Sequence, residues 1–178
     1  MPKPSVKDFS VVLDGVDILF SWRGDRWSHA IHFRGRADAA TWRSVEGSEQ
    51  PEGDAAWPAS PVIAEVSPVD SARAVVGVGR AGKSHYSVSF TAKPAGGVTA
   101  KPADESEPGI LVECACRIHE PPGWLGSTYE HAGPAGTPAR LVRIPAMILP
   151  GVDAPLPRTV TWSYVVGPTG PVPCRRPG

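Results

Sequence analysis

RAVVGVGRAGKSHYSVSF, residues 73–90, is the stretch that decides the fold, because it fits two incompatible structures. In the first structure it is a phosphate-binding loop, whose backbone N–H groups hold phosphates while a lysine and a hydroxyl reach the terminal phosphates and Mg²⁺. Four residues match the spacing of that motif, G-x-x-x-x-G-K-[ST]: Gly77, Gly82, Lys83 and Ser84. In the second structure the same residues are two β-strands joined by a glycine-rich turn.

The residues after Lys83 favour the second structure. A phosphate-binding loop needs a helix directly after its lysine. Instead, Tyr86, Val88 and Phe90 alternate with polar residues, which is the period of a β-strand. The sequence therefore predicts a hairpin with its turn at residues 79–82 and with an exposed lysine. Nucleotide binding at this stretch is kept as the alternative.

Composition limits the class of protein. The chain has 178 residues, 41% of them hydrophobic and 20% charged, which is typical of a globular domain with its own core. Eighteen basic and eighteen acidic side chains give a formal net charge of zero, so neither nucleic acid nor a membrane is an expected partner. We find no apolar run typical of a signal peptide or a membrane helix, and therefore expect a soluble, cytoplasmic protein.

Short alternating segments separated by turn residues account for most of the chain. Three of them are expected to form a meander, with Asp14-Gly15 as the first turn; they cover residues 9–13, 16–22 and 27–33. Further strands are expected at residues 61–67, 72–78, 84–91, 110–118, 140–144 and 158–166. About eight to ten strands with little helix predict an all-β fold, an antiparallel β-sandwich, with a β-barrel as the alternative.

The segments between these strands are harder to interpret. Residues 37–45 fit either a helical turn or a strand. Residues 119–139 are expected to form a long loop, which is either a lid over the core or a binding surface. We expect residues 1–166 to form a single β domain and residues 167–178 to form a proline-rich, flexible tail.

Aromatic residues at turns and loops are the candidate ligand-binding residues. Trp124 and Tyr129 lie in the expected loop 119–139, while Arg26 and Trp27 lie where the second and third strands meet. Aromatic side chains on loops over a β scaffold can stack on a sugar or anchor a protein partner. These four residues therefore suggest a protein or carbohydrate partner.

A metal site at two cysteines is a third possibility. Cys114 and Cys116 alternate on the expected strand 110–118, so both side chains point to one side. Two thiolates could supply half of a zinc site, with His119 or His29 completing it. The competing interpretation is that both cysteines are small apolar residues of the core, and no second cysteine pair is present.

No catalytic signature is found in the sequence. The histidines are scattered, and neither H-E-x-x-H nor G-x-S-x-G occurs. The sequence thus favours a non-enzymatic binding or interaction module without a cofactor. Nucleotide binding is the second hypothesis and metal-dependent activity is the third.

Overall fold

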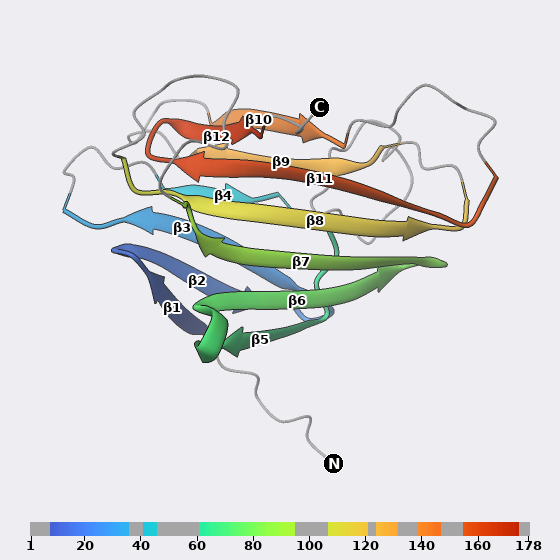
Figure 1. The fold of residues 1–178 in the computed structure, drawn as a ribbon, viewed down its shortest axis with the longest axis horizontal. Coiled ribbons are helices and arrows are strands. Elements are labelled where there is room, and N and C mark those ends of the chain that lie inside the picture. The colour runs from blue at the N-terminus through green and yellow to red at the C-terminus, as the bar shows by residue number, and fades with distance from the viewer. Residues whose placement is uncertain are drawn as a thin grey trace, which may run out of the picture.

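The computed structural model describes residues 8–35, 41–45, 61–94, 107–120, 124–131, 139–146 and 155–174. Two antiparallel six-stranded sheets, called sheet A and sheet B below, pack face to face (Figure 1). This arrangement confirms the predicted all-β sandwich. Among the described residues, no helix has the length and apolar character needed to cross a lipid bilayer.

Sheet A has the strand order β1-β2-β3-β4-β9-β10, and every neighbouring pair is antiparallel. Its strands are β1 (Phe9–Leu13), β2 (Val16–Trp22), β3 (Trp27–Phe33), β4 (Trp42–Ser44), β9 (Gly126–His131) and β10 (Arg140–Pro145). Strands β1 and β10 are therefore its two edges.

Sheet B has the strand order β12-β11-β8-β7-β6-β5 and is also fully antiparallel. Its strands are β5 (Glu65–Val69), β6 (Ala74–Ala81), β7 (Ser84–Ala92), β8 (Ile110–Ile118), β11 (Arg158–Gly167) and β12 (Gly170–Pro173). A short 3-10 turn, η2 (Asp70–Ala72), connects β5 to β6. Strand β12 lies against β10 of sheet A, which closes one side of the sandwich (Figure 1).

Turn chemistry fixes the first hairpin. Leu13 and Val16 are the last paired residues of β1 and β2, so the loop between them holds only Asp14 and Gly15. Both have positive φ, 46° and 81°, as a type I′ turn requires. The predicted turn and the predicted bounds of the first three strands are confirmed.

The hairpin predicted at residues 73–90 is also confirmed. Ala81 pairs with Ser84, so the loop contains only Gly82 and Lys83 and is shorter than the expected turn at residues 79–82. Gly82 adopts a φ of 57°, which glycine allows at little cost. Strand β7 begins at Ser84, the position where a phosphate-binding loop would start its helix.

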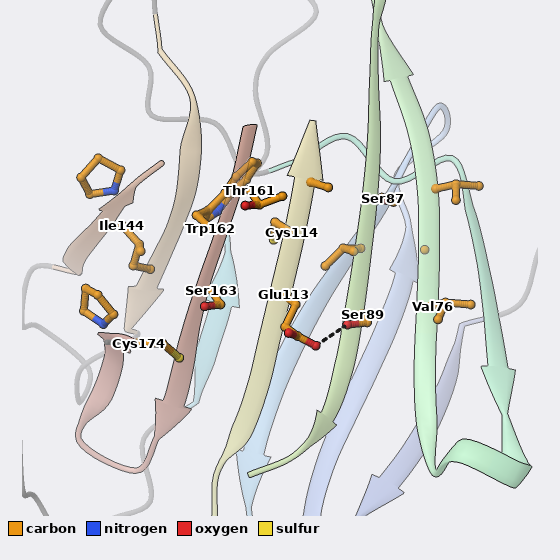
Figure 2. A pocket seen from close by; sticks show the side chains of 16 residues that line it. Val76, Ser87, Ser89, Glu113, Cys114, Ile144, Thr161, Trp162, Ser163 and Cys174 are labelled. Atoms are coloured by element: carbon orange, nitrogen blue, oxygen red, sulfur yellow. Dashed lines mark hydrogen bonds between the residues drawn. The ribbon is translucent and has the colours of Figure 1, made fainter. Parts of the chain in front are cut away.

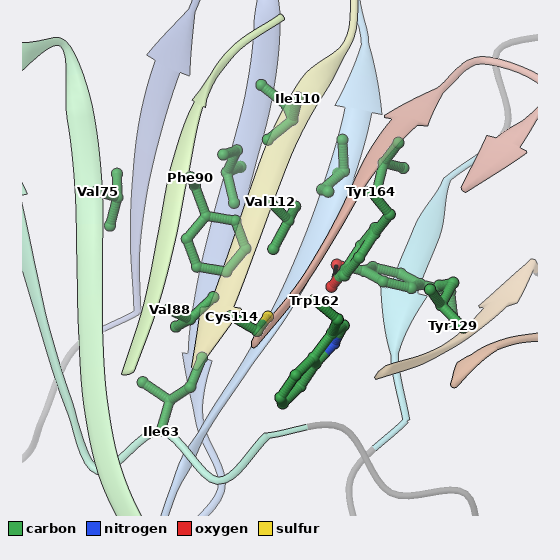
Figure 3. Packing of buried hydrophobic residues seen from close by; sticks show 14 of the residues in the cluster. Ile63, Val75, Val88, Phe90, Ile110, Val112, Cys114, Tyr129, Trp162 and Tyr164 are labelled. Carbon is green, nitrogen blue, oxygen red and sulfur yellow. Dashed lines mark hydrogen bonds between the residues drawn. The ribbon is translucent and has the colours of Figure 1, made fainter. Parts of the chain in front are cut away.

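The core lies between the sheets and is built from the inward-facing residues of both. Strand β8 alternates strictly, with every second residue from Ile110 to Ile118 buried. Figure 3 shows the sheet B side chains Val75, Phe90 and Val112 in this layer. The largest fully buried side chains are Trp42, Tyr129, Tyr164, Phe20 and Phe90.

Residues 61–64 cross between the two sheets. The strand expected at residues 61–67 therefore starts later than predicted, because β5 begins at Glu65. The Trp27 N–H of sheet A donates to the Ile63 carbonyl at 2.7 Å. The Ala64 N–H donates to the Val78 carbonyl of sheet B at 2.8 Å. A Cβ at Gly79 would collide with the Val62 carbonyl, so this crossing needs a glycine on β6.

The structure adds three strands to those that the sequence predicts. Residues 42–44 form β4, which settles the ambiguous stretch in favour of a strand. Residues 126–131 form β9 inside the expected loop 119–139. Residues 170–173 form β12, so the expectation of a flexible tail from residue 167 is wrong there. Prolines obscured β12 in the sequence, but an edge strand tolerates them because one side of it has no ladder.

Candidate ligand-binding groove

A groove with a volume of about 690 Å³ crosses the outer face of sheet B, over strands β6, β7, β8, β11 and β12 (Figure 2). Strand registers place its outward-facing side chains in two neighbouring rows. The first row is Val76, Ser89, Glu113 and Ser163, and the second row is Val78, Ser87, Ala115 and Thr161. Pro145 and Pro173 line the end of the groove near β10 and β12.

Apolar and polar side chains occupy different parts of the groove. Val76 and Val78 on β6 are 38% and 49% exposed, which is high for valine. Hydroxyl groups occupy the middle of the groove, where the Ser89 hydroxyl donates to the Glu113 carboxylate at 3.4 Å. A ligand in this groove would contact aliphatic carbon at one end and hydrogen-bonding oxygens in the middle.

The electrostatic character of the groove is mildly negative. Glu113 contributes a carboxylate, and no lysine, arginine or histidine is among the described residues that line the groove. The thiol of Cys174 also lines it, and burial raises the pKa of that thiol, with a further contribution from the charge of Glu113. The thiol therefore stays protonated at neutral pH, and the groove offers no positive charge to an anion.

The backbone between the two rows forms the floor of the groove, and its side chains point into the core. The Trp162 indole N–H donates to the Ser127 hydroxyl at 3.0 Å. The Cys114 Sγ lies 3.9 Å from the same hydroxyl. These contacts hold β8 and β11 of sheet B against β9 of sheet A beneath the groove.

A buried polar chain connects the two sheets beside this floor. His29 Nε2 lies 2.7 Å from the Tyr129 hydroxyl, which lies 3.1 Å from the Tyr164 hydroxyl. Burial lowers the pKa of His29 to about 3 and raises the pKa of Tyr164. The His29 and Tyr164 side chains are therefore neutral near pH 7. Because His29, Tyr129 and Tyr164 are all buried, we assign these hydrogen-bonded side chains a structural role.

A second, smaller hollow of about 470 Å³ lies on the outer face of sheet A. Its lining mixes both signs of charge, with Arg23, Arg43 and Glu130 around small side chains. The Arg23 Nε–H donates to the Ser28 hydroxyl at 2.9 Å. Because basic and acidic groups share this hollow, it has weaker charge selectivity than the groove on sheet B.

The four predicted ligand-binding residues do not line the groove. Tyr129 is fully buried on β9 and Trp27 is 8% exposed, so neither is the surface aromatic that we expected. Phe9 and Trp22 pack edge-on against Trp27, with ring centroids 5.4 Å away in each case. Trp124 is half-buried before β9. Arg26 forms an ion pair with Asp25, with its side chain 15% exposed.

The residues that match the phosphate-loop spacing belong to the β6–β7 hairpin. Gly77 faces inward, where a Cβ would lie 2.8 Å from the Ile63 side chain. Lys83 Nζ forms an ion pair with Glu120 Oε1 at 2.7 Å, and both side chains are largely exposed. Gly82 and Lys83 form the turn, and Ser84 is the first residue of β7.

The cysteines on β8 share one buried face, as their spacing predicts. Burial raises the pKa of Cys114 to about 12 and also raises the pKa of Cys116, which disfavours the thiolates that bind zinc. His119 follows the end of the strand, with its ring 6.1 Å from that of His85. Among the residues that the structure describes, no three His, Cys, Asp or Glu side chains form a metal-binding group.

Sequence reasoning missed the residues of the groove: Ser87, Ser89, Glu113, Thr161 and Ser163. The available signal was the polar half of each alternating strand. That pattern identifies an outward face but not a hollow one, since any solvated sheet face has the same pattern.

No protein-family model, no curated protein and no solved structure matches this chain.

Proposed function

We propose that the protein is a non-enzymatic binding module that holds a neutral saccharide in the groove on the outer face of sheet B. The observation that carries this proposal is the composition of the groove, which combines hydroxyl groups and one carboxylate with exposed valines and has no cationic side chain in its described lining. Its volume of about 690 Å³ falls in the range typical of ligand sites.

The chemistry of the lining supports an uncharged, hydroxyl-rich ligand. The Glu113 carboxylate can accept hydrogen bonds from ligand hydroxyls, and such charge-assisted bonds are stronger than neutral ones. Ser87, Thr161 and Ser163 can both donate and accept. The aliphatic faces of Val76 and Val78 suit the C–H faces of a sugar ring. A phosphorylated ligand would meet a carboxylate instead of a cation.

The groove also has room for more than one sugar ring. The groove spans five adjacent strands, and neighbouring strands lie about 4.8 Å apart. The distance from β6 to β12 is therefore roughly 19 Å. We accordingly expect an oligosaccharide to bind more tightly than a monosaccharide, because only the longer ligand reaches both the valines and Ser163.

Titration with a panel of neutral oligosaccharides, followed by backbone amide NMR shifts, tests the proposal. We expect shifts at Ser89, Glu113 and Ser163, and a loss of roughly tenfold or more in affinity in Glu113→Gln, since a hydrogen bond to a charged group is worth about 1.5–3 kcal/mol. Glu130→Gln, which removes a carboxylate on the outer face of sheet A, is the matched control and should bind normally.

Two outcomes would contradict the proposal. One is that no saccharide in the panel perturbs the groove. The other is that Glu130→Gln weakens binding as much as Glu113→Gln does. ATP with Mg²⁺ serves as the charged comparison. We expect it to leave the melting temperature of the wild type and of Lys83→Ala unchanged, because β7 replaces the helix that a phosphate-binding loop requires.

A further inference from the structure

The described residues form four edge strands, and three of these strands carry features that disfavour pairing with another chain. Edge strands are commonly protected by proline and by charged side chains. Strand β5 contains Pro68, and β12 contains Pro171 and Pro173. Strand β10 has Arg140 and Arg143 and ends at Pro145.

Strand β1, the remaining edge, has no such protection. Its sequence FSVVL contains neither proline nor a charged residue, and within the described residues it pairs only with β2. On the outer face of the sheet, Val12 is 47% exposed and pairs with Asp17 of β2, while Leu19 of β2, which pairs with Ser10, is 36% exposed. Phe9 and Val11 face the core but stay half-buried at its rim. A further strand beside β1 would cover these apolar side chains.

We propose that β1 pairs antiparallel with β1 of a second copy of this chain, so that the two A sheets join into one continuous sheet across a two-fold axis. The occupant is a second copy because FSVVL is complementary to itself. Pairing centred on Val11 matches all five residues, with Phe9 of one copy opposite Leu13 of the other and no charged side chain inside the pairing.

The hydrogen-bond pattern of the first hairpin supports this register. Leu13 and Val16 flank the two-residue turn and form a hydrogen-bonded pair, and the pattern alternates along the strand. The N–H and C=O groups of Ser10 and Val12 therefore point away from β2. Centring the pairing on Val11 places Ser10 of one copy opposite Val12 of the other, so these outward-pointing groups bond to each other.

The ends of the paired strands add a small electrostatic cost. The register brings Asp8 of one copy toward Asp14 of the other. Arg73 forms an ion pair with Asp14, and Asp8 accepts hydrogen bonds from Ser21 Oγ at 3.0 Å and from the Trp22 N–H at 3.1 Å. Because the centre of the interface is apolar and its ends are acidic, added salt should leave the dimer unchanged or strengthen it.

Sedimentation velocity over a range from about 10 µM to about 1 mM tests the association, because an edge of five residues predicts a weak dimer. We expect the wild type to dimerise with rising concentration. Val12→Lys and Ser10→Pro should each remain monomeric. Neither removes a hydrogen bond to β2, since the N–H of Ser10 points outward. Leu141→Lys, at an equally exposed leucine (48%) on β10, is the control and should dimerise like the wild type.

A cross-linking experiment tests the register separately. In a Cys174→Ser background, Ser10→Cys and Val12→Cys proteins are oxidised alone and as a mixture. Opposite residues of a hydrogen-bonded pair lie about 5.5 Å apart at Cα, within disulfide range. We expect a covalent dimer chiefly in the mixture.

The proposal is overturned if the wild type stays monomeric across the concentration range. It is equally overturned if Leu141→Lys abolishes the dimer while Val12→Lys does not, or if the mixture gives no more cross-linked dimer than each variant alone. These results do not depend on saccharide binding, so failure of the groove proposal would leave the dimer intact.

Discussion

His29 is a histidine that the fold keeps neutral. It is 5% exposed, and its ring packs edge-on against Phe90 at 4.8 Å while Nε2 meets the Tyr129 hydroxyl. Within the described part of the chain, its Nδ1 has no hydrogen-bond partner. Burial of this ring penalises the imidazolium form, which carries a positive charge.

This environment makes stability depend on pH. Burial lowers the pKa of His29 from 6.5 to about 3 in the folded state, so between these values the unfolded state binds the additional proton. The stability from His29 is complete above its unfolded pKa and is lost as the pH falls toward 3. We expect the free energy of unfolding to decrease by up to about 1.4 kcal/mol per pH unit through this residue.

Urea denaturation of the wild type and of His29→Gln between about pH 7 and pH 4 measures this contribution. The glutamine can still bond to Tyr129 but does not titrate, so the curve of the variant should be flatter. Titration of Asp17 and Asp25 does not interfere with the comparison of the two pH dependences. The hydrogen bonds of Arg34 and Arg26 lower their pKa values below 3.8, so their effect lies at lower pH. Equal slopes in both proteins would show that His29 is not the titrating group.

At the scale of the element, Gly79 of β6 sets how closely residues 61–64 approach sheet B. Gly79→Ala would place a Cβ against the Val62 carbonyl and 2.9 Å from the Ala64 nitrogen. Backbone atoms cannot move aside as a flexible side chain does. We expect a loss of about 1–3 kcal/mol in the free energy of unfolding, as for other overpacked sites.

Gly82→Ala is the matched control for this prediction. Gly82 lies in the turn of the same hairpin, and no atom lies within 4 Å of a Cβ placed there. Its φ of 57° costs an alanine about 1 kcal/mol. Chemical denaturation should therefore give Gly79→Ala a lower free energy of unfolding than Gly82→Ala. The reverse order would contradict the close approach of residues 61–64 to β6.

The alternation of apolar and polar residues predicted the strands whose inward faces are mostly apolar. The bounds of β1, β2, β3 and β8 agree with expectation because most of their inward positions hold Val, Ile, Leu, Phe, Trp or Cys, with buried His29 on β3 as an exception. The β6–β7 hairpin was recognised for the same reason. Apolar period-two patterns are local, so the sequence alone displays them.

Strand β9 escaped prediction because its buried positions include polar residues. Ser127 and Thr128 are fully buried, yet both are residues typical of loops. Ser127 is satisfied by Trp162, a residue far along the chain on β11. The groove escaped prediction similarly, since it depends on five strands lying side by side. Neither feature has a local signature.

At the scale of the whole molecule, the last described residues of the chain secure the closed side of the sandwich. The Trp42 indole N–H of sheet A donates to the Pro168 carbonyl at 3.3 Å. Gly170 lies directly against the same ring, where a Cβ would approach to 3.0 Å. Trp42 is 1% exposed as a result.

Deleting residues 167–178 should therefore destabilise the protein, in contrast to the removal of a flexible tail. The deletion uncovers Trp42 and removes β12, and we expect a loss of about 3 kcal/mol or more, the scale of a lost large core contact. Urea denaturation measures the loss. A chain lacking only residues 175–178 keeps every described contact of β12 and is the control. Equal stability of the two deletions would contradict the role of β12.

The strand order of sheet B also determines when its thiols become protected during synthesis. Strand β8 carries Cys114 and Cys116 and is covered on its second side by β11, which is translated much later. Until Arg158–Gly167 has emerged from the ribosome, β8 can pair only with β7 and is an edge strand of sheet B. We expect both thiols to react with a maleimide reagent at that stage, whereas the finished sandwich buries them. Their reactivity on stalled nascent chains would therefore record the moment at which the second sheet closes.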